Sequence, residues 1–277
     1  MTPLICPICR GALTLYGGSY RCPQGHTYDR SRYGYTNLLS GKAFGQHGDN
    51  REMILSRRRF LDSGAYAPLR DALCHAVKAR HPKGGVLLDA GCGECYYTDK
   101  VVTQLSDPDS TYYGIDISRE ALRAAGVRRS VKEGALHLFV SGVYEMPFAD
   151  ESVDTILNLF APLACEEYLR VLRPCGTLIM AIPDRRHLYS LKEILYDTPR
   201  ENEVQDFALD GFSLLSATPV RSEFTLEGTL IQDLFMMTPY YYRTPRTGRE
   251  RLNACDTLTT EGAFLLLTYQ KREKEST

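Results

Sequence analysis

Four residues near the start of the chain have the types and spacing of a metal site. Cys6 and Cys9 are separated by two residues, and twelve residues later Cys22 and His26 follow with three residues between them. Three thiolates and one imidazole are donors that tetrahedral Zn2+ prefers, and each closely spaced pair can bend around one ion. Four protein ligands leave no coordination position open. The spacing therefore predicts a structural zinc site, with a redox-active Cys-x-x-Cys as the alternative.

The segment around these ligands is basic and poor in aliphatic residues. Residues 1–47 carry five basic side chains and one acidic side chain, a formal +4: Arg10, Arg21, Arg30, Arg32, Lys42 and Asp29. Three thiolates and one Zn2+ would lower that charge to about +3. The segment needs a cross-link, such as a bound metal ion, because it cannot build a hydrophobic core alone. Its charge suggests contact with a phosphate backbone, and a solubilising surface is the alternative.

A second group of residues follows the first predicted core strand. Asp89 ends the run VLLD, and Gly91 and Gly93 come directly after it. The glycines allow the turn to pass close to a ligand at the start of the next helix. Asp116 ends the next predicted strand, where its carboxylate could accept two ribose hydroxyls. A nicotinamide-binding loop would have a third glycine where Tyr96 stands, so the pattern argues against that cofactor.

Short β-rich runs alternate with helical segments over this part of the chain. The predicted strands are 86–89, 112–116, 136–141, 155–160 and 177–182. Strands that alternate with helices indicate βαβ units and a parallel sheet. Two later strands at 222–227 and 263–270, around a helix at 230–237, would add an antiparallel edge. The sequence thus predicts an α/β fold with a Rossmann-like, mostly parallel sheet and a small N-terminal zinc-binding module.

The composition is that of a folded globular protein. Of 277 residues, 43% are hydrophobic and 24% charged, and 33 basic residues against 34 acidic ones leave a net charge of -1. The whole-chain charge therefore predicts no polyanion partner, and local charge decides. Nine cysteines, an odd number, make a poor disulfide framework. No apolar run approaches the ~18 residues of a membrane span, so we expect a soluble, cytoplasmic protein without membrane contact.

The order of these motifs resembles that of class I S-adenosylmethionine-dependent methyltransferases. The resemblance rests on Asp-x-Gly-x-Gly after the first strand, an acid after the second, VYEMPFADESVD before the fourth and LRVLRPCGTLIM before the fifth. It implies that the loop 89–93 binds the methionine portion of S-adenosylmethionine and that Asp116 binds its ribose. The same resemblance implies that the segment with Glu145 and Met146 lies near the adenine.

Three cysteines in this region need separate interpretation. Cys95 and Cys175 depart from the methyltransferase pattern, which commonly has glycine at both positions. Cys92 and Cys95 also form a Cys-x-x-Cys pair in a strand-to-helix turn. A redox interpretation of that pair would leave Asp89 and Asp116 without a function, and we therefore favour the cofactor loop.

Read together, the zinc segment and the later motifs are similar to the bacterial 23S rRNA (guanine-N1)-methyltransferases. The matching segments are CPICRGAL, SYRCPQGHTYD, GYTNLL, RRRFLDSGAYAPLRDAL, DAGCGECYYT, LFAP, RHLYSLKEILY and MTPYYYR. The resemblance implies methylation of one guanine in a domain II hairpin loop of 23S rRNA by a homodimer whose zinc modules flank an RNA cleft. It also implies that Tyr66, Gly93, Glu94 and His187 surround the cofactor. From the residues alone, Tyr66 would be a core aromatic and His187 a loop histidine.

The reaction requires removal of a proton, because N1 of guanine is protonated at neutral pH. A carboxylate or a water chain could accept that proton. Glu166, Glu167 and Asp184 follow predicted strands on the ligand side of the sheet. Glu166 and Glu167 also fit ordinary acids at a helix N-terminus. We therefore assign no catalytic residue from the sequence.

Aromatic and basic residues are the candidates for RNA contact. Phe160, with Pro162 shaping its turn, could stack on a flipped base, and a core phenylalanine is the alternative. Tyr240 belongs to a set that could form an RNA surface or an alternating strand with a basic flank: Tyr240, Tyr241, Tyr242, Arg243, Arg246, Arg249 and Arg251. The run 57–59 consists of three arginines that cannot share one helix surface, and it is interpreted as a solvated face with one residue able to reach RNA.

The sequence thus predicts three parts. Residues 1–40 form a zinc-binding RNA-recognition module, 41–84 a linker and helices that cap the cofactor site, and 85–277 the methyltransferase domain. A small-molecule methyltransferase with an accessory zinc-binding module is one alternative. A nonenzymatic RNA-binding protein with a decayed cofactor fold is the other, since Cys95 and Cys175 depart from the pattern.

Overall fold

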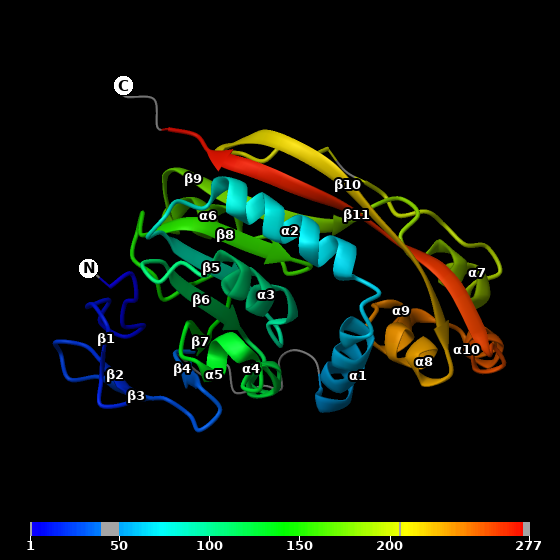
Figure 1. Ribbon diagram of the computed structural model, residues 1–277, viewed down its shortest axis with the longest axis horizontal. Coiled ribbons are helices and arrows are strands. Elements are labelled where there is room, and N and C mark those ends of the chain that lie inside the picture. The colour runs from blue at the N-terminus through cyan, green and yellow to red at the C-terminus, as the bar shows by residue number, and fades with distance from the viewer. Residues whose placement is uncertain (1, 40–49, 205, 274–277) are drawn as a thin grey trace.

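A computed structural model describes residues 2–39, 50–204 and 206–273, and its main feature is an eight-stranded sheet (Figure 1). In spatial order the strands are β10 (Phe212–Glu227), β11 (Thr257–Lys271), β9 (Leu172–Pro183), β8 (Val153–Leu159), β5 (Val86–Ala90), β6 (Thr111–Asp116), β7 (Leu136–Val140) and β4 (Tyr35–Asn37). All neighbouring pairs are parallel except those made by β11, which runs antiparallel to both β9 and β10. The predicted parallel sheet with an antiparallel edge is confirmed.

Helices cover both faces of this sheet. Along the chain they are α1 (Arg51–Asp62), α2 (Ala67–Arg80), α3 (Tyr96–Leu105), α4 (Arg119–Ala125), α5 (Arg129–Lys132), α6 (Cys165–Val171), α7 (Tyr189–Leu195), α8 (Thr229–Met236), α9 (Tyr240–Arg243) and α10 (Arg246–Asn253). Leu87 and Leu88 of β5 point to opposite faces and pack into different hydrophobic clusters, one with α2 and α3 and one with α6. None of these helices is long and apolar enough to span a membrane.

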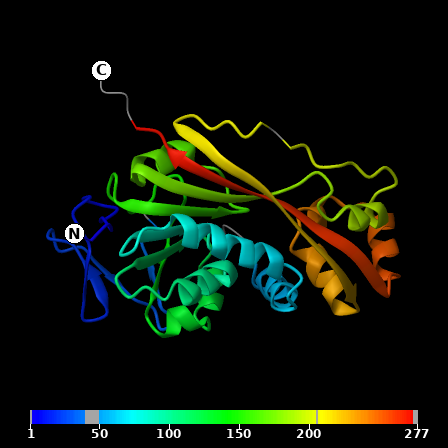
Figure 2. The same cartoon turned by 45° about the horizontal axis from the view of Figure 1, so that its top comes forward.

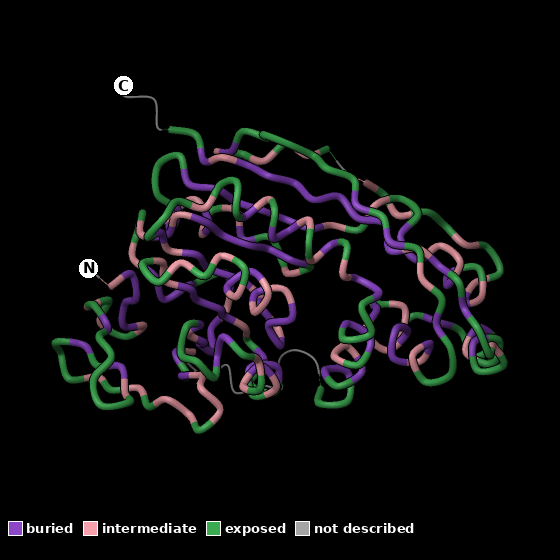
Figure 3. Tube along the Cα trace, in the orientation of Figure 1, coloured by how far each residue is buried: buried purple, intermediate pink, exposed green. Residues whose placement is uncertain are grey.

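Strands β10 and β11 are much longer than the predicted runs 222–227 and 263–270. They form an antiparallel ribbon that extends past the parallel strands toward α8 and α10 (Figures 1 and 2). Residues 213–219 of β10 are exposed, whereas β11 beside them is largely buried (Figure 3). A strand exposed on both faces needs no apolar alternation, and Pro219 is tolerated on such an edge. The pattern of the sequence therefore revealed only the last part of β10.

The N-terminal segment is attached to the main sheet. Its own small sheet contains β1 (Thr14–Tyr16), β2 (Ser19–Arg21) and β3 (Thr27–Asp29), and β4 then pairs with β7 at the edge of the main sheet. Leu4, Leu13 and Tyr20 pack in the same hydrophobic cluster as Phe139 and Phe148. The segment thus shares a hydrophobic core with the main sheet. The division at residues 40 and 84 stays a prediction, and Lys42 lies outside the described residues.

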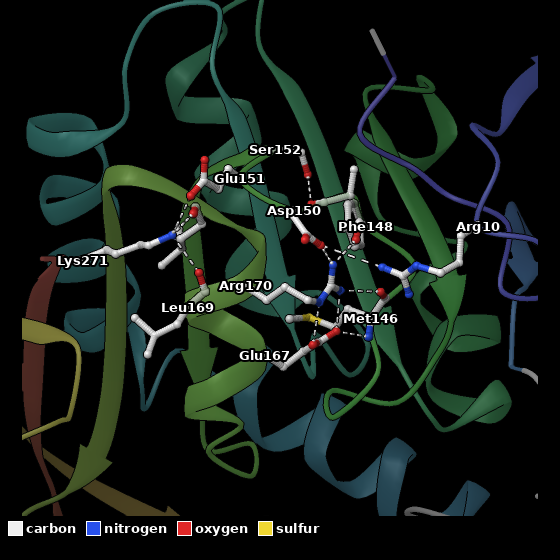
Figure 4. Close-up of polar contacts among 12 residues, drawn as sticks. Arg10, Met146, Phe148, Asp150, Glu151, Ser152, Glu167, Leu169, Arg170 and Lys271 are labelled. Atoms are coloured by element: carbon white, nitrogen blue, oxygen red, sulfur yellow. Dashed lines mark hydrogen bonds and ion pairs between the residues drawn. The ribbon is translucent and has the colours of Figure 1, made fainter. Parts of the chain in front are cut away.

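A network around Arg170 fixes the loop between β7 and β8 (Figure 4). The Arg170 guanidinium donates to the carboxylates of Glu167 and Asp150, each at 2.6 Å, and to the carbonyls of Phe148 and Met146 at 2.7 and 3.0 Å. A planar five-donor group can satisfy several acceptors that a lysine could not. This network holds residues 146–150 against α6.

Cys175 shows why glycine is common in this pattern. It has φ +61°, in the left-handed region, and Cys95 has φ +62°. A side chain in that conformation costs about 1 kcal/mol. We therefore expect Cys175→Gly to raise the free energy of unfolding by about 1 kcal/mol, measured by urea denaturation. The matched control is Cys255→Gly, because Cys255 lacks a positive φ and should lose stability. Equal effects of the two changes would contradict this explanation.

Candidate functional site

A cavity of about 1080 Å3 opens at the carboxyl ends of β5, β6 and β8. It is large enough for a cofactor and part of a second ligand, since single drug-sized ligands occupy about 300–1,000 Å3. The predicted site residues that line it are Tyr66, Asp89, Gly91, Gly93, Glu94, Asp116, Phe160, Pro162, His187 and Tyr240. Topology brings them together because the carboxyl ends of parallel strands share one edge.

Two predicted residues, Glu145 and Met146, do not line this cavity. They line a second cavity of about 250 Å3 beside the zinc segment, together with Arg10. Val143 and Tyr144 from the same loop line the large cavity instead. The sequence motif thus located the loop, but the direction of each side chain depends on the turn that the Arg170 network fixes.

The loop after β5 is tied to the end of β6. Gly91 has φ +89°, and a Cβ there would collide with the side chain of Ala161. Gly93 has open space around its Cα, and its N–H donates to Asp116 Oδ2 at 2.9 Å. Asp116 Oδ1 accepts from the N–H of Ser118 at 2.7 Å. These contacts orient the Asp116 carboxylate at the cavity wall.

Asp89 is buried and only partly satisfied. Its Oδ2 accepts from the Thr98 hydroxyl, whereas Oδ1 has no partner among the described residues. Burial raises the pKa of Asp89 to about 7, against the Thr98 hydrogen bond, which lowers it. A buried acceptor without a partner is costly unless a ligand completes it. The carboxylate therefore fits a cationic or hydrogen-bond-donating group, such as the ammonium of a methionine moiety.

Glu94 joins the loop to the arginine run 57–59. Its carboxylate accepts from Arg58 Nε at 2.5 Å and also from Arg128. Arg59 donates to both oxygens of Asp233 on α8, at 2.5 and 2.8 Å. The interpretation of this run as a solvated face is therefore wrong for Arg58, whose side chain is 21% exposed, and correct for Arg59, whose side chain is paired but 54% exposed. Helical rotation sends each arginine to a different element, and Arg57 lines the cavity.

Tyr66 and His187 contact each other in the wall of the cavity. The Tyr66 hydroxyl lies 3.4 Å from His187 Nε2, and the imidazole centroid lies 4.6 Å from that of Phe264. Burial lowers the pKa of His187 to about 4, so the ring is neutral at neutral pH. Both side chains can offer a neutral hydrogen bond to a ligand there.

Phe160 is a half-exposed side chain at the end of β8. Its side chain is 47% exposed and its φ is +62°, so the interpretation as a core phenylalanine is wrong. Asn158 holds the turn, because its Nδ2 donates to the Pro162 carbonyl at 3.1 Å and to the Tyr168 hydroxyl at 2.6 Å. Backbone strain that displays an aromatic ring is typical of ligand sites. Sequence reasoning missed Asn158, a polar residue inside an apolar strand.

Helix α9 contributes Tyr240 and Arg243 to the outer wall. The alternating strand considered for this segment is wrong, since residues 240–243 are helical. Arg249 donates to the Tyr241 carbonyl and Arg251 to the Ile194 carbonyl, so these two arginines hold the helices together. The segment supplies fewer cations to a ligand than its sequence suggests.

The acids proposed as proton acceptors do not line the cavity. Glu167 accepts from the Met146 N–H at 2.6 Å and from Arg170, and Glu166 is exposed on α6. Asp184 accepts from the N–H of Arg185 at 2.7 Å. Among the described residues, the carboxylates that line the cavity are those of the loop and of β6: Asp89, Glu94 and Asp116.

The four predicted metal ligands converge. Their donor atoms all lie within 4.8 Å of one another, with Cys9 Sγ 3.5 Å from Cys22 Sγ and His26 Nδ1 3.3 Å from Cys22 Sγ. These separations suit the edges of a tetrahedron with Zn–S of about 2.3 Å and Zn–N of about 2.0 Å. The Tyr28 hydroxyl lies 3.1 Å from Cys6 Sγ, where it can donate to a thiolate. The donor set fits structural zinc.

Comparison with known proteins supports both the zinc segment and the methyltransferase part of the chain. A zinc-ribbon family model described as RlmA, N-terminal, matches residues 4–42, and a methyltransferase domain model matches 81–232. YxjB of Bacillus subtilis (strain 168), provisionally named a 23S rRNA (guanine-N1)-methyltransferase, is 31% identical over 87% of each chain. The 23S rRNA (guanine(748)-N1)-methyltransferase of Streptomyces fradiae is 32% identical over 69% of this chain and 67% of its own. The YcgJ structure from Bacillus subtilis covers 72% of this chain and 97% of its own at 14% identity and a TM-score of 0.47.

Proposed function

Because the chain belongs to the family of 23S rRNA (guanine-N1)-methyltransferases, we propose that it methylates N1 of a guanine in a domain II hairpin loop of 23S rRNA. The observation that carries this proposal is the shared cavity. It joins the loop with Asp89 and Gly93 to the half-exposed ring of Phe160. A cofactor and a flipped base can therefore meet in one cavity.

The loop and the strand ends would bind S-adenosylmethionine, which supplies an electrophilic methyl group. Asp116 would accept the ribose hydroxyls, and the free Oδ1 of Asp89 would accept from the ammonium. Tyr66 and His187 close the far wall. Glu94 would hold the loop in place. Its carboxylate pairs with Arg58 and Arg128, and these contacts anchor the loop to α1 and to the segment before α5.

Positioning supplies most of the acceleration in this proposal. Phe160 would stack on the guanine and hold N1 in line with the methyl group, while α9 with Tyr240 forms the outer wall. The N1 proton passes to solvent water, since the carboxylates lining the described cavity belong to its cofactor end. Tyr144 lines both the large cavity and the smaller one beside the zinc segment, so RNA can extend from Phe160 toward Arg10.

The test combines transfer and mapping. Purified protein is incubated with tritiated S-adenosylmethionine and unmodified 23S rRNA, and labelled RNA is read by primer extension, because N1 methylation blocks base pairing. A stop at one guanine of the domain II hairpin supports the proposal, and position 748, named for the Streptomyces relative, is the first to inspect. Label on RNA outside that hairpin would contradict the site. Absence of label despite cofactor binding would contradict the substrate.

We also propose that the protein acts in the cytoplasm as a homodimer, so that two zinc segments flank one RNA. We expect this dimer to form in the absence of RNA. Sedimentation equilibrium of the purified chain tests this, with a mass near twice 31.2 kDa expected. A mass of one chain at all concentrations would contradict it.

Cofactor affinity should depend on pH through Asp89. Its raised pKa of about 7 means that the carboxyl is protonated below that pH and ionised above it. Since only the ionised form pairs with an ammonium, the dissociation constant of S-adenosylmethionine should rise up to about tenfold between about pH 8 and about pH 6. Calorimetry over this range measures it. Asp89→Asn should bind weakly with no such dependence.

The control for this experiment is Asp109→Asn, an exposed carboxylate at the other end of the sheet. It should keep the pH dependence of the unaltered protein. His187 does not contribute in this window because its pKa is about 4. A pH dependence that persists in Asp89→Asn would assign the titration to another group.

A further inference from the structure

The hydroxyl of Tyr97 is buried in the cavity wall without a hydrogen-bond partner among the described residues. Tyr97 is the second residue of α3 and lines the cavity, and its hydroxyl oxygen is buried with no hydrogen-bond partner among the described residues. Its neighbour Tyr96 differs, since Arg70 donates to that hydroxyl at 3.3 Å. Buried hydroxyls are nearly always satisfied, so an unpaired one in a cavity wall indicates a bound polar group.

Tyr97 lies at the acceptor end of the cavity. Its ring centroid is 6.5 Å from that of Phe160, and the Phe160 centroid is 5.7 Å from that of Phe264. These rings form the wall against which a base would stack. The Tyr97 hydroxyl is therefore placed to meet the edge of that base.

The groups around Tyr97 keep its hydroxyl protonated. Burial raises the pKa of Tyr97 far above its ordinary value, Tyr96 raises it further, and the charges of Arg57 and Arg70 oppose the shift. Tyr66 also interacts electrostatically with Tyr97, and this interaction raises the pKa of Tyr66. The hydroxyl is thus a hydrogen-bond donor, and it is not a base, throughout the pH range of an assay.

On the basis of the proposed function, we propose that Tyr97 donates its hydroxyl hydrogen to O6 of the target guanine and stabilises the N1-deprotonated base. In this step N1 first loses its proton to solvent water, and the negative charge spreads over N1 and O6. N1 then bonds to the methyl carbon while the carbon–sulfur bond breaks and its electron pair stays on sulfur. A donor at O6 favours the anion, and Arg57 on α1 adds positive charge nearby.

The same contact would select the base. Guanine carries an acceptor at C6, whereas adenine carries an amino donor there, which would leave the Tyr97 hydroxyl unpaired. Tyr97 would therefore act in both acceleration and specificity.

The test is Tyr97→Phe, which keeps the ring and removes the hydroxyl. The kcat/KM for a 23S rRNA fragment containing the hairpin is measured from about pH 6.5 to about pH 9.5, with the dissociation constant of S-adenosylmethionine measured in parallel. We expect about a tenfold to hundredfold loss near neutral pH, and a loss that shrinks as pH rises and the base ionises without help. The cofactor dissociation constant should stay within about twofold.

The matched control is Tyr112→Phe, a buried tyrosine of β6 whose hydroxyl contacts the Asp107 carbonyl away from the cavity. It should keep the pH profile of the unaltered protein. A loss in Tyr97→Phe that is equal at every pH, no loss, or weaker cofactor binding instead would each overturn the inference. Failure of the unaltered protein to methylate N1 would instead reject the proposed function itself.

Discussion

Asp116→Asn is expected to weaken S-adenosylmethionine binding by about a hundredfold and to reduce rRNA methylation at least as much. The carboxylate already accepts two backbone N–H groups, from Gly93 at 2.9 Å and Ser118 at 2.7 Å. An amide keeps one acceptor, and its NH2 would face an N–H group or a ribose hydroxyl hydrogen. Two charge-assisted hydrogen bonds to ribose, each about 1.5–3 kcal/mol, are weakened or lost, and about 2.7 kcal/mol corresponds to a hundredfold.

Calorimetry with S-adenosylmethionine and tritium transfer to 23S rRNA measure this effect. The matched control is Asp154→Asn, because Asp154 also accepts a strand N–H, that of Val86 at 2.8 Å, but outside the cavity. The control should lose stability and keep cofactor affinity. Asp116→Asn should keep a cooperative thermal transition. Unchanged cofactor affinity in Asp116→Asn would remove the ribose assignment and with it the proposed orientation of the cofactor.

Local signals in the sequence were sufficient for the parts of the site that the backbone defines. The zinc ligands lie within a short segment, so their spacing alone predicts convergence. Asp89 and Asp116 end neighbouring parallel strands, and topology then requires that they meet. In both cases residue type and strand order carry the information, and the details of side-chain packing are not needed.

Parts of the site that depend on side-chain direction could not be predicted. Arg58 and Arg59 occupy adjacent positions, yet one pairs with Glu94 and the other with Asp233, because the partner helix α8 comes from a distant part of the chain. Likewise, a turn decides that Tyr144 lines the large cavity while Glu145 does not. Such outcomes follow from tertiary packing, which a single sequence does not display.

Cys22→Ser is expected to remove zinc and to reduce methylation of 23S rRNA by about a hundredfold or more, with a smaller effect on cofactor affinity. Metal binding contributes about 10–16 kcal/mol in small zinc modules, so the segment should lose its order without the ion. Tyr20, on the strand before Cys22, packs edge-on against Phe139 of the main sheet at 5.1 Å. That contact ties the zinc site to the sheet edge, whereas Asp89 and Asp116 lie in the cavity on β5 and β6.

Metal content by mass spectrometry, thermal unfolding, cofactor calorimetry and rRNA methylation together separate the two halves of this expectation. The control is Cys175→Ser, an exposed thiol outside the cluster that should keep zinc, affinity and activity. If Cys22→Ser loses zinc but still methylates rRNA at the normal rate, the N-terminal segment takes no part in RNA recognition. If it loses cofactor affinity to the same extent as methylation, the metal supports the whole sheet through Phe139. An RNA-specific loss is expected, because the described part of the zinc segment contributes no lining residue to the large cavity, whereas its Arg10 lines the smaller one.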